Sequence, residues 1–129
     1  MKKLLIVDDQ KGIRMLLDEI FTKEGYETYL ASNGLEAFEL LEKEKIDCVL
    51  LDMRLPGMDG NEILKRIKEI YPKLAVFIMT AFDELEIKEK TKSLGADECF
   101  TKPFNIFEVI EKVNKVLKQR SNNGNDTSE

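Results

Sequence analysis

The sequence contains no histidine and no tryptophan, and it has only two cysteines and three prolines among 129 residues. Without histidine the chain cannot carry a serine–histidine–aspartate triad, the common zinc motifs or a phosphohistidine of its own. No apolar run approaches the roughly 20 residues that a transmembrane helix needs, and the acids Asp8 and Asp9 come too early for a signal peptide. We therefore expect a cytoplasmic protein with no membrane partner.

A basic block is also missing. The formal net charge is −5, and lysines and arginines are interspersed with acids, so nucleic-acid binding is not expected. Cys48 and Cys99 both fall in predicted strands that a third strand separates. Strands two apart lie roughly 9–10 Å from each other, whereas a disulfide needs Cα atoms within about 7 Å. We expect two thiols and no cross-link.

The length suits one domain, and it is too short for a catalytic domain plus an output domain. We assign residues 1–120 to this domain. From Ser121 onward the sequence is polar and has no periodicity, which predicts a disordered tail over residues 121–129.

Short apolar runs alternate with segments of helical periodicity. We expect five buried strands, at residues 3–7, 26–31, 46–52, 74–80 and 97–101. The residues expected to face the sheet from the first three helices are Ile13, Leu16, Leu17, Ile20, Phe21, Leu35, Phe38, Leu41, Ile63, Leu64, Ile67 and Ile70. The fourth helix, over residues 83–94, has a sparse apolar stripe, and Asn105 caps the last.

This alternation predicts an α/β fold, a three-layer α/β/α sandwich of the flavodoxin-like kind. Its five-stranded parallel sheet would have the order 2-1-3-4-5.

Four of these strands end on polar residues: Asp8 and Asp9, Asp52, Thr80 and Lys102. Ligands of open parallel sheets lie at the carboxyl ends of the strands, so these side chains should meet at one edge. Taken alone, Asp52 could simply begin a turn, because Pro56-Gly57 follows it closely. The convergence of four strand ends favours a site over that reading.

Three carboxylates in close range repel one another unless a cation is present, and hard oxygen ligands suit Mg²⁺. Asp52 could act as a nucleophile that forms an aspartyl phosphate. Lys102 could pair with Asp52 at rest and contact a phosphoryl oxygen later, while the Thr80 hydroxyl could donate to the same group. The alternative is a surface salt-bridge cluster, which gives no reason for the groups to converge.

These motifs, together with the segment from Leu50 to Gly60, resemble the receiver domain of bacterial two-component response regulators over residues 3–117. The resemblance implies that Asp52 is the phosphoacceptor. It also implies that Asp9, Asp52 and the Met53 carbonyl bind Mg²⁺, with Asp8 acting through water. Lys102 would contact the phosphoryl group, and Thr80 would move toward it on activation.

More narrowly, the segment from Asp8 to Leu17 is similar to that of single-domain regulators of sporulation phosphorelays. Such regulators accept a phosphoryl group from a sensor histidine kinase and pass it to a histidine phosphotransferase. The resemblance implies a partner-docking rim made of Gln10, Gly12, Ile13, Leu17, Phe82, Pro103 and Phe104. For Ile13 and Leu17, helix core is an equal alternative, because their spacing fits a buried stripe.

One position departs from the family pattern. Cys99 occupies the switch position, three residues before Lys102, where many receivers carry an aromatic residue. Phe100 is next to it, but strand alternation turns its side chain to the opposite face.

Three other functions are alternatives to a phosphoryl-accepting signalling domain. A phosphohydrolase of the haloacid dehalogenase type needs an acid two residues after the nucleophile, and that position is Arg54. A chemotaxis-type regulator would bind a target when phosphorylated, and a binding module would use the fold without phosphorylation. We expect a phosphoacceptor that assists its own phosphorylation and slow dephosphorylation, and not an enzyme.

Overall fold

The computed structural model describes residues 2–81 and 85–127 and has five parallel strands in one sheet. The strands stand in the order β2-β1-β3-β6-β7. They are β1 (Lys3–Val7), β2 (Glu27–Ala31), β3 (Cys48–Asp52), β6 (Ala75–Thr80) and β7 (Glu98–Thr101). The predicted order 2-1-3-4-5 is confirmed, since β6 and β7 are the fourth and fifth strands of this sheet. Their labels differ because a small hairpin precedes them.

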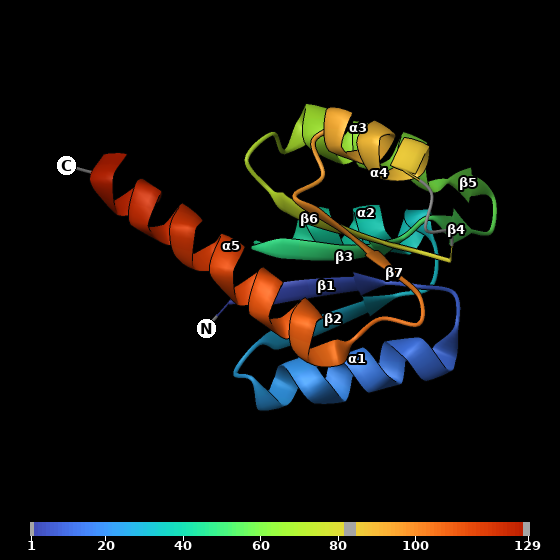
Figure 1. Ribbon diagram of the computed structural model, residues 1–129, viewed down its shortest axis with the longest axis horizontal. Helices are drawn as coiled ribbons and strands as arrows, with labels where there is room; N and C mark the ends of the chain where they lie inside the picture. Colours follow the sequence, from blue (N-terminus) through green and yellow to red (C-terminus); the bar gives the residue numbers. More distant parts are fainter. Residues whose placement is uncertain (1, 82–84, 128–129) are drawn as a thin grey trace.

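The hairpin consists of β4 (Arg54–Leu55) and β5 (Met58–Asp59), which pair antiparallel. The sequence predicted only turns here. Pro56 and Gly57 connect the two strands, and Gly57 has φ +79°, as the third position of a type II turn requires. The hairpin projects from the carboxyl end of the sheet (Figure 1).

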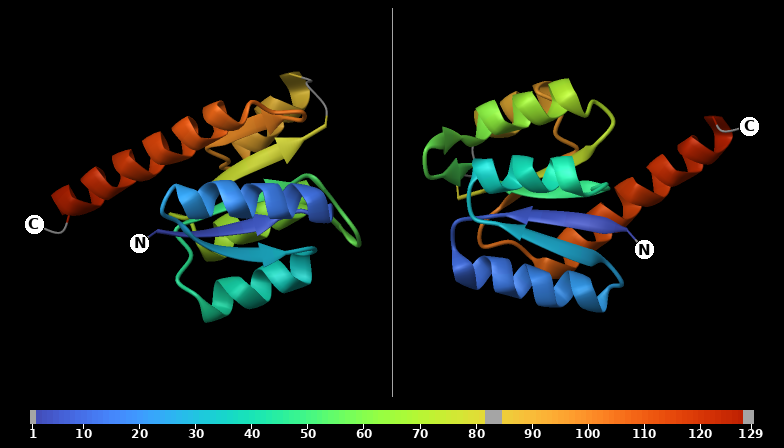
Figure 2. Two further views of the ribbon diagram at one scale, coloured as in Figure 1. Left: turned by 90° about the horizontal axis from the view of Figure 1, so that it is seen from below. Right: turned by 180° about the vertical axis from the view of Figure 1, so that it is seen from behind.

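Helices cover both faces of the sheet, giving the predicted three layers (Figures 1 and 2). The helices are α1 (Lys11–Lys23), α2 (Gly34–Lys43), α3 (Gly60–Ile70), α4 (Leu85–Ser93) and α5 (Ile106–Thr127). Helices α1 and α5 supply Leu17, Phe21, Val109 and Val113 to one buried cluster. The other face packs against α2 and α3 and against the segment that follows α4.

The central strands β3 and β6 have no alternation of apolar and polar residues in their sequence, and their burial explains why. All five residues of β3 and all six of β6 are buried. A strand covered by helices on both faces has no solvent side for polar residues. Each fully buried aliphatic side chain of this kind stabilises the fold by about 1.5–3 kcal/mol.

Three apolar residues expected in the core lie on the surface. Leu16 is 46% exposed, Leu35 71% and Ile70 60%. In α2 the inward residues are Ala37 and Leu41, and Leu35 precedes Ala37 by two positions, which is about 200° around the helix. Ala37 faces the sheet in place of the larger Leu35. The buried face of α2 is therefore rotated relative to the predicted stripe.

Helix α5 is continuous to Thr127, whereas the sequence predicts a disordered tail from Ser121. No proline interrupts residues 121–127, so the helical hydrogen-bond ladder can continue from the preceding turns. The last turns extend beyond the sheet (Figure 2). The disorder of the tail stays a prediction.

Candidate functional site

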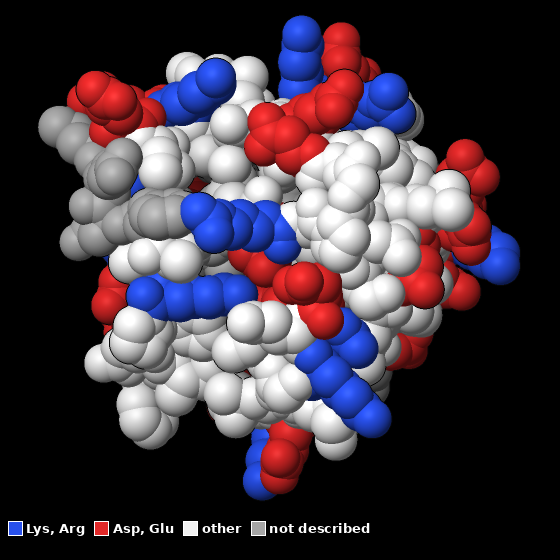
Figure 3. Space-filling model, turned by 90° about the vertical axis from the view of Figure 1, so that its right-hand side faces the viewer, with Lys and Arg blue, Asp and Glu red and all other residues white. Residues whose placement is uncertain are grey.

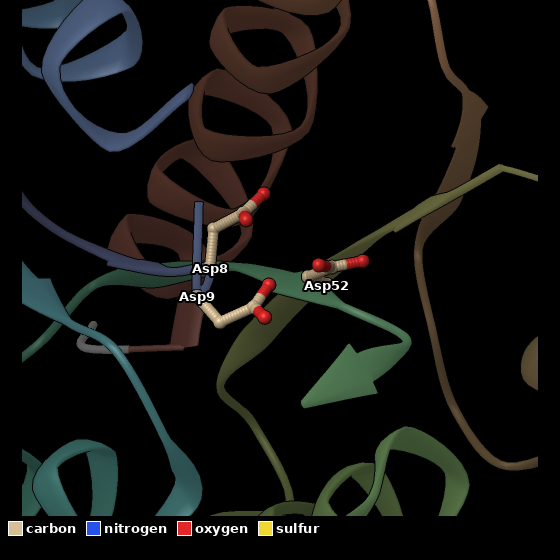
Figure 4. A group of neighbouring side chains, drawn as sticks. All are labelled: Asp8, Asp9 and Asp52. Atoms are coloured by element: carbon tan, nitrogen blue, oxygen red, sulfur yellow. The ribbon is translucent and has the colours of Figure 1, made fainter. Parts of the chain in front are cut away.

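Three carboxylates meet where β1 and β3 end. The two strands are neighbours, with Val7 paired to Leu51, so Asp8 and Asp9 leave β1 beside Asp52 (Figure 4). Each residue offers a carboxylate oxygen, and these oxygens all lie within 4.8 Å of one another. Asp8 is fully buried and Asp52 is 5% exposed, while Asp9 is open to solvent. The predicted acidic cluster is therefore present.

Lys102 brings one positive charge into the cluster from the end of β7. Its Nζ lies 2.8 Å from Asp8 Oδ2 and 3.5 Å from Asp52 Oδ2. The sequence suggested a pair with Asp52, but the shorter contact is to Asp8. The Lys102 backbone N–H also donates to the Thr80 carbonyl at 2.7 Å. This bond ties the ends of β6 and β7 together.

The carboxylate of Asp52 lies in an environment that disfavours its negative charge. The pKa of Asp52 is raised above its usual value, first because burial removes water from the carboxylate and then because Asp8 repels its charge. Lys102 and the Arg54 backbone N–H, which donates to Asp52 Oδ1 at 3.3 Å, oppose this rise. A cation held among the carboxylates would relieve the repulsion.

The Met53 carbonyl follows Asp52 directly. It accepts a hydrogen bond from the Gly60 N–H at 3.1 Å, and a carbonyl oxygen can accept a second interaction. A Cβ at Gly60 would lie 2.6 Å from Met53 Cα. Glycine is therefore needed for α3 to start close against this backbone. The close approach fixes Met53 next to the acids.

Thr80 ends β6 and is 2% exposed. With Arg54, Asn61, Ile87 and Lys90 it lines a cavity of about 320 Å³ between the hairpin and α4. The hydroxyl is thus beside the site and next to the helix for which the sequence predicts the weakest packing.

The predicted docking rim is only partly on the surface. Gln10, Gly12 and Pro103 are exposed, while Ile13 and Phe104 are half-buried. Leu17 is fully buried in the core, so its assignment to the rim is wrong and the helix-core alternative holds. Phe82 lies outside the described residues. Met15, on the same helix as Leu17, is 58% exposed.

Cys99 and Phe100 face opposite sides of the sheet, as strand alternation predicted. Cys99 is half-buried against the core on the α2 and α3 side. Phe100 belongs to the other core and stacks on Phe77, with ring centroids 6.3 Å apart. Neither Cys48 nor Cys99 forms a disulfide.

Charged side chains of both signs surround this edge. Figure 3 views the carboxyl end of the strands and shows acidic side chains near the middle of the face, with lysine and arginine side chains beside them. The mixed pattern matches the interspersed charges of the sequence.

A family model described as "Response regulator receiver domain" matches residues 4–114. The chain belongs to this family. Receivers bind Mg²⁺ at an acidic pocket, and this receiver has the cluster of Asp8, Asp9 and Asp52 at that place. The predicted family is confirmed.

The receiver is 54% identical over 121 residues to a protein of Bacillus subtilis (strain 168) named "Sporulation initiation phosphotransferase F". The match covers 94% of this chain and 98% of that protein. Among solved structures, a CheY-like receiver domain protein from Methanospirillum hungatei JF-1 has 30% identity and a TM-score of 0.90, covering 95% and 98% of the two chains. A Francisella response regulator receiver domain has 33% identity and a TM-score of 0.87, covering 92% and 98%.

The prediction that the protein is not an enzyme is contradicted by the name of the Bacillus relative, which is a phosphotransferase. The prediction had Asp52 pass the phosphoryl group on, but it did not count this transfer as an enzymatic activity. A carrier that hands the group on is regenerated after each transfer, and this property defines a catalyst of phosphoryl transfer.

The structure tests only one part of the prediction of a cytoplasmic protein with no membrane partner, namely the absence of a membrane-spanning helix. Within residues 2–81 and 85–127, no helix is both long and apolar enough to span a bilayer. The cytoplasmic location stays a prediction.

Proposed function

We propose that this receiver is the intermediate carrier of a sporulation-type phosphorelay. It would accept a phosphoryl group on Asp52 from the histidine of a sensor kinase and pass it to a histidine of a phosphotransferase. The observation that carries the proposal is the set of buried acids with Lys102 at the strand ends, in a chain that is 54% identical to a sporulation phosphotransferase. Because the chain has no histidine, both histidines must belong to partners.

In the accepting step, a carboxylate oxygen of Asp52 bonds to phosphorus as the phosphorus–nitrogen bond of the donor breaks. The electron pair of that bond stays on the imidazole nitrogen. The return step runs in the opposite sense with a different histidine. Asp52 is suited to this role because its carboxylate lies at the open edge of the sheet and is held by the Arg54 N–H and Lys102.

The residues that would hold Mg²⁺ are Asp9, Asp52 and the Met53 carbonyl, with Asp8 acting through water. The donor set fits this ion, because it consists of oxygen ligands with an excess of negative charge. When bound, the metal supplies positive charge that stabilises the transferring phosphoryl oxygens.

Lys102 and Thr80 would act on the phosphoryl group once it arrives. Lys102 holds Asp8 and lies near Asp52, so a small movement would bring its ammonium to a phosphoryl oxygen. Thr80 would donate its hydroxyl and shift toward Asp52, changing the packing beside α4. The half-buried Cys99 leaves this switch without the usual aromatic partner.

Partner docking would use the exposed part of the rim, namely Gln10, Gly12 and Pro103 with the partly accessible Ile13 and Phe104. Gln10 and the first turn of α1, with Gly12 and Ile13, follow Asp9 in the chain, and Pro103 and Phe104 follow Lys102. A partner bound there would therefore place its histidine over Asp52. This geometry supports transfer of a phosphoryl group between two proteins more than it supports binding of a target at a surface far from Asp52.

The test is the intact mass of the protein after incubation with Mg²⁺ and acetyl phosphate. We expect a gain of one phosphoryl group, lost in Asp52→Asn and after chelation of the metal. Asp59→Asn is the matched control, because Asp59 is an exposed acid of the hairpin that follows β3 and asparagine can also cap α3. Phosphorylation of Asp52→Asn to the same extent as the wild type would contradict the assignment.

A second arm separates a relay from a regulator that only binds its target. The phosphorylated protein is mixed with a histidine phosphotransferase, and the label is followed. A relay predicts loss of the group from this chain and its gain by the partner histidine. Stable binding of a target without transfer would instead support the chemotaxis-type alternative.

A further inference from the structure

A side chain of α1 reaches the backbone of the acid pair. Arg14 Nη1 donates to the Asp8 carbonyl oxygen at 2.7 Å. This carbonyl belongs to the peptide unit that joins Asp8 to Asp9, and the unit is planar. Holding the oxygen therefore restrains ψ of Asp8 and φ of Asp9. It also restrains the direction in which the Asp9 side chain leaves the backbone.

Asp8 lies just past the last paired residue of β1, and each of its polar groups has a different partner. Its N–H donates to Ala31 O at 3.1 Å, and its Oδ1 accepts from the Gln10 N–H at 2.9 Å. Its Oδ2 pairs with Lys102. Arg14 supplies the partner of the remaining carbonyl, which strand pairing no longer satisfies. A buried carbonyl without such a donor is costly.

Asp9 differs from its neighbour. Within the described part of the chain its carboxylate makes no hydrogen bond and no ion pair, and the residue is exposed. Without such contacts, its orientation depends on the backbone that carries it. Arg14 is the side chain that anchors this backbone from outside the turn.

The charge of Arg14 also acts on a carboxylate of α2. Arg14 lies near Glu36 at the start of α2, and the pKa of Glu36 is lowered first by hydrogen bonds from Ser32 and also by the charge of Arg14. The Ser32 N–H and hydroxyl donate to Glu36 at 2.7 and 2.8 Å. Arg14 thus combines its hydrogen bond to the Asp8 carbonyl with an electrostatic attraction to Glu36.

We infer that Arg14 is a positioning residue of the metal site. It does not touch the metal but orients the Asp8–Asp9 peptide, so that Asp9 is presented beside Asp52 before Mg²⁺ arrives. The inference rests on the proposed function, because it assumes that Asp9 is a ligand. It assigns to Arg14 a role within the site itself, separate from partner docking.

Charge and positioning predict opposite effects, which makes the inference testable. Arg14→Met removes a positive charge near three acids, so electrostatics alone predicts tighter Mg²⁺ binding. Loss of the backbone anchor predicts weaker binding, because an outer partner that orients a ligand typically changes metal affinity by about 10–100-fold. The sign of the change distinguishes the two.

The experiment is a Mg²⁺ titration of the unphosphorylated protein, followed by amide chemical shifts. The variants are Arg14→Met, Arg14→Lys and the control Lys11→Met. Lys11 is an exposed cation at the start of α1, so its loss changes the net charge equally without touching the Asp8 carbonyl. Thermal unfolding in the absence of metal checks that each variant folds.

We expect the dissociation constant for Mg²⁺ to rise about tenfold in Arg14→Met, near the lower limit for an outer partner. Arg14→Lys should lie between this variant and the wild type, because lysine keeps a donor of shorter reach. Lys11→Met should bind as the wild type or slightly tighter.

Equal or tighter Mg²⁺ binding by Arg14→Met would overturn the inference and leave the proposed function intact. If Arg14→Met fails to fold, wild-type affinity in Arg14→Lys with an unchanged Asp9 amide shift would overturn it in the same way. A wild-type protein that binds no Mg²⁺ would overturn both the proposed metal site and the role of Arg14. The two failures are therefore distinguishable.

Discussion

The two ends of the sheet handle charge in different ways. At the amino ends of the strands, Asp97 Oδ2 accepts from the Val76 N–H at 3.0 Å and its Oδ1 accepts from Arg120 at 2.7 Å. Asp47 likewise accepts from the Lys3 N–H at 2.7 Å. At the carboxyl ends, Asp8 and Asp52 share one lysine and repel each other.

The difference separates carboxylates that stabilise the fold from the carboxylates to which we assign the phosphoryl chemistry. An acid matched to its own donors is a fixed part of the structure, and its removal leaves those donors unsatisfied. Asp8 and Asp52 share the single positive charge of Lys102, so a further cation would be bound favourably between them. Removing a carboxylate at the amino ends of the strands should therefore lower the free energy of unfolding, whereas removing one at the carboxyl ends should raise it.

The largest effect is expected at the amino end. Asp97→Ala should lower the free energy of unfolding by about 2–3 kcal/mol, because the Val76 N–H and Arg120 both lose their acceptor. Urea denaturation measures this change. Asp97→Asn is the control and should lose less, since an amide oxygen can still accept from one of the two donors. A loss within about 0.5 kcal/mol, as for ordinary surface changes, would contradict the comparison.

An intermediate effect is expected from adding Mg²⁺. At a Mg²⁺ concentration ten times its dissociation constant, the free energy of unfolding should rise by about 1.4 kcal/mol through linkage. Chelation should reverse the gain, and Asp52→Asn should reduce it. Unfolding is compared at equal ionic strength in NaCl, so that screening is held constant. Equal stabilisation of wild type and Asp52→Asn would place the metal elsewhere.

The smallest effect concerns Asp52 without metal. At neutral pH, Asp52→Asn should raise the midpoint of thermal unfolding by a few degrees, because the charge it removes is buried and repelled by Asp8. Asp59→Asn should show little change. An Asp52→Asn variant that is less stable than the wild type at neutral pH would reverse the expected sign.

The same argument predicts a pH dependence. The folded pKa of Asp52 lies above its unfolded value, so this residue favours folding below the unfolded pKa, and that contribution is lost as pH rises through the folded pKa. The advantage of Asp52→Asn over the wild type should therefore shrink as pH falls. An advantage that grew on acidification would contradict the raised pKa.

Strand order and the acidic cluster could be predicted from the sequence because each depends on one strong signal. Long apolar runs mark buried strands, and the polar residue after each run must then lie at the shared edge. The hairpin could not be predicted, since strands of two residues show no periodicity. Leu17 was ambiguous and Leu35 was wrongly expected to face the sheet, because a helical stripe fixes spacing but leaves the exact rotation of the helix open.

Contacts between side chains that are far apart in the sequence could not be predicted from it. Lys102 was expected to approach Asp52, but its closer partner is Asp8, and this choice depends on less than 1 Å in the placement of a flexible side chain. The contact of Arg14 with a backbone carbonyl leaves no pattern in the sequence at all. Such contacts follow only from the packed arrangement of elements.

The two thiols give the molecule a selective attachment point for a reporter. Cys48 is fully buried in the middle of the sheet, and burial raises the pKa of its thiol, which suppresses the reactive thiolate. Cys99 is partly accessible and stands three residues before Lys102 on β7. A maleimide fluorophore should therefore label Cys99 in preference to Cys48. Such a dye would report movements of the strand that carries the lysine, without any engineered cysteine.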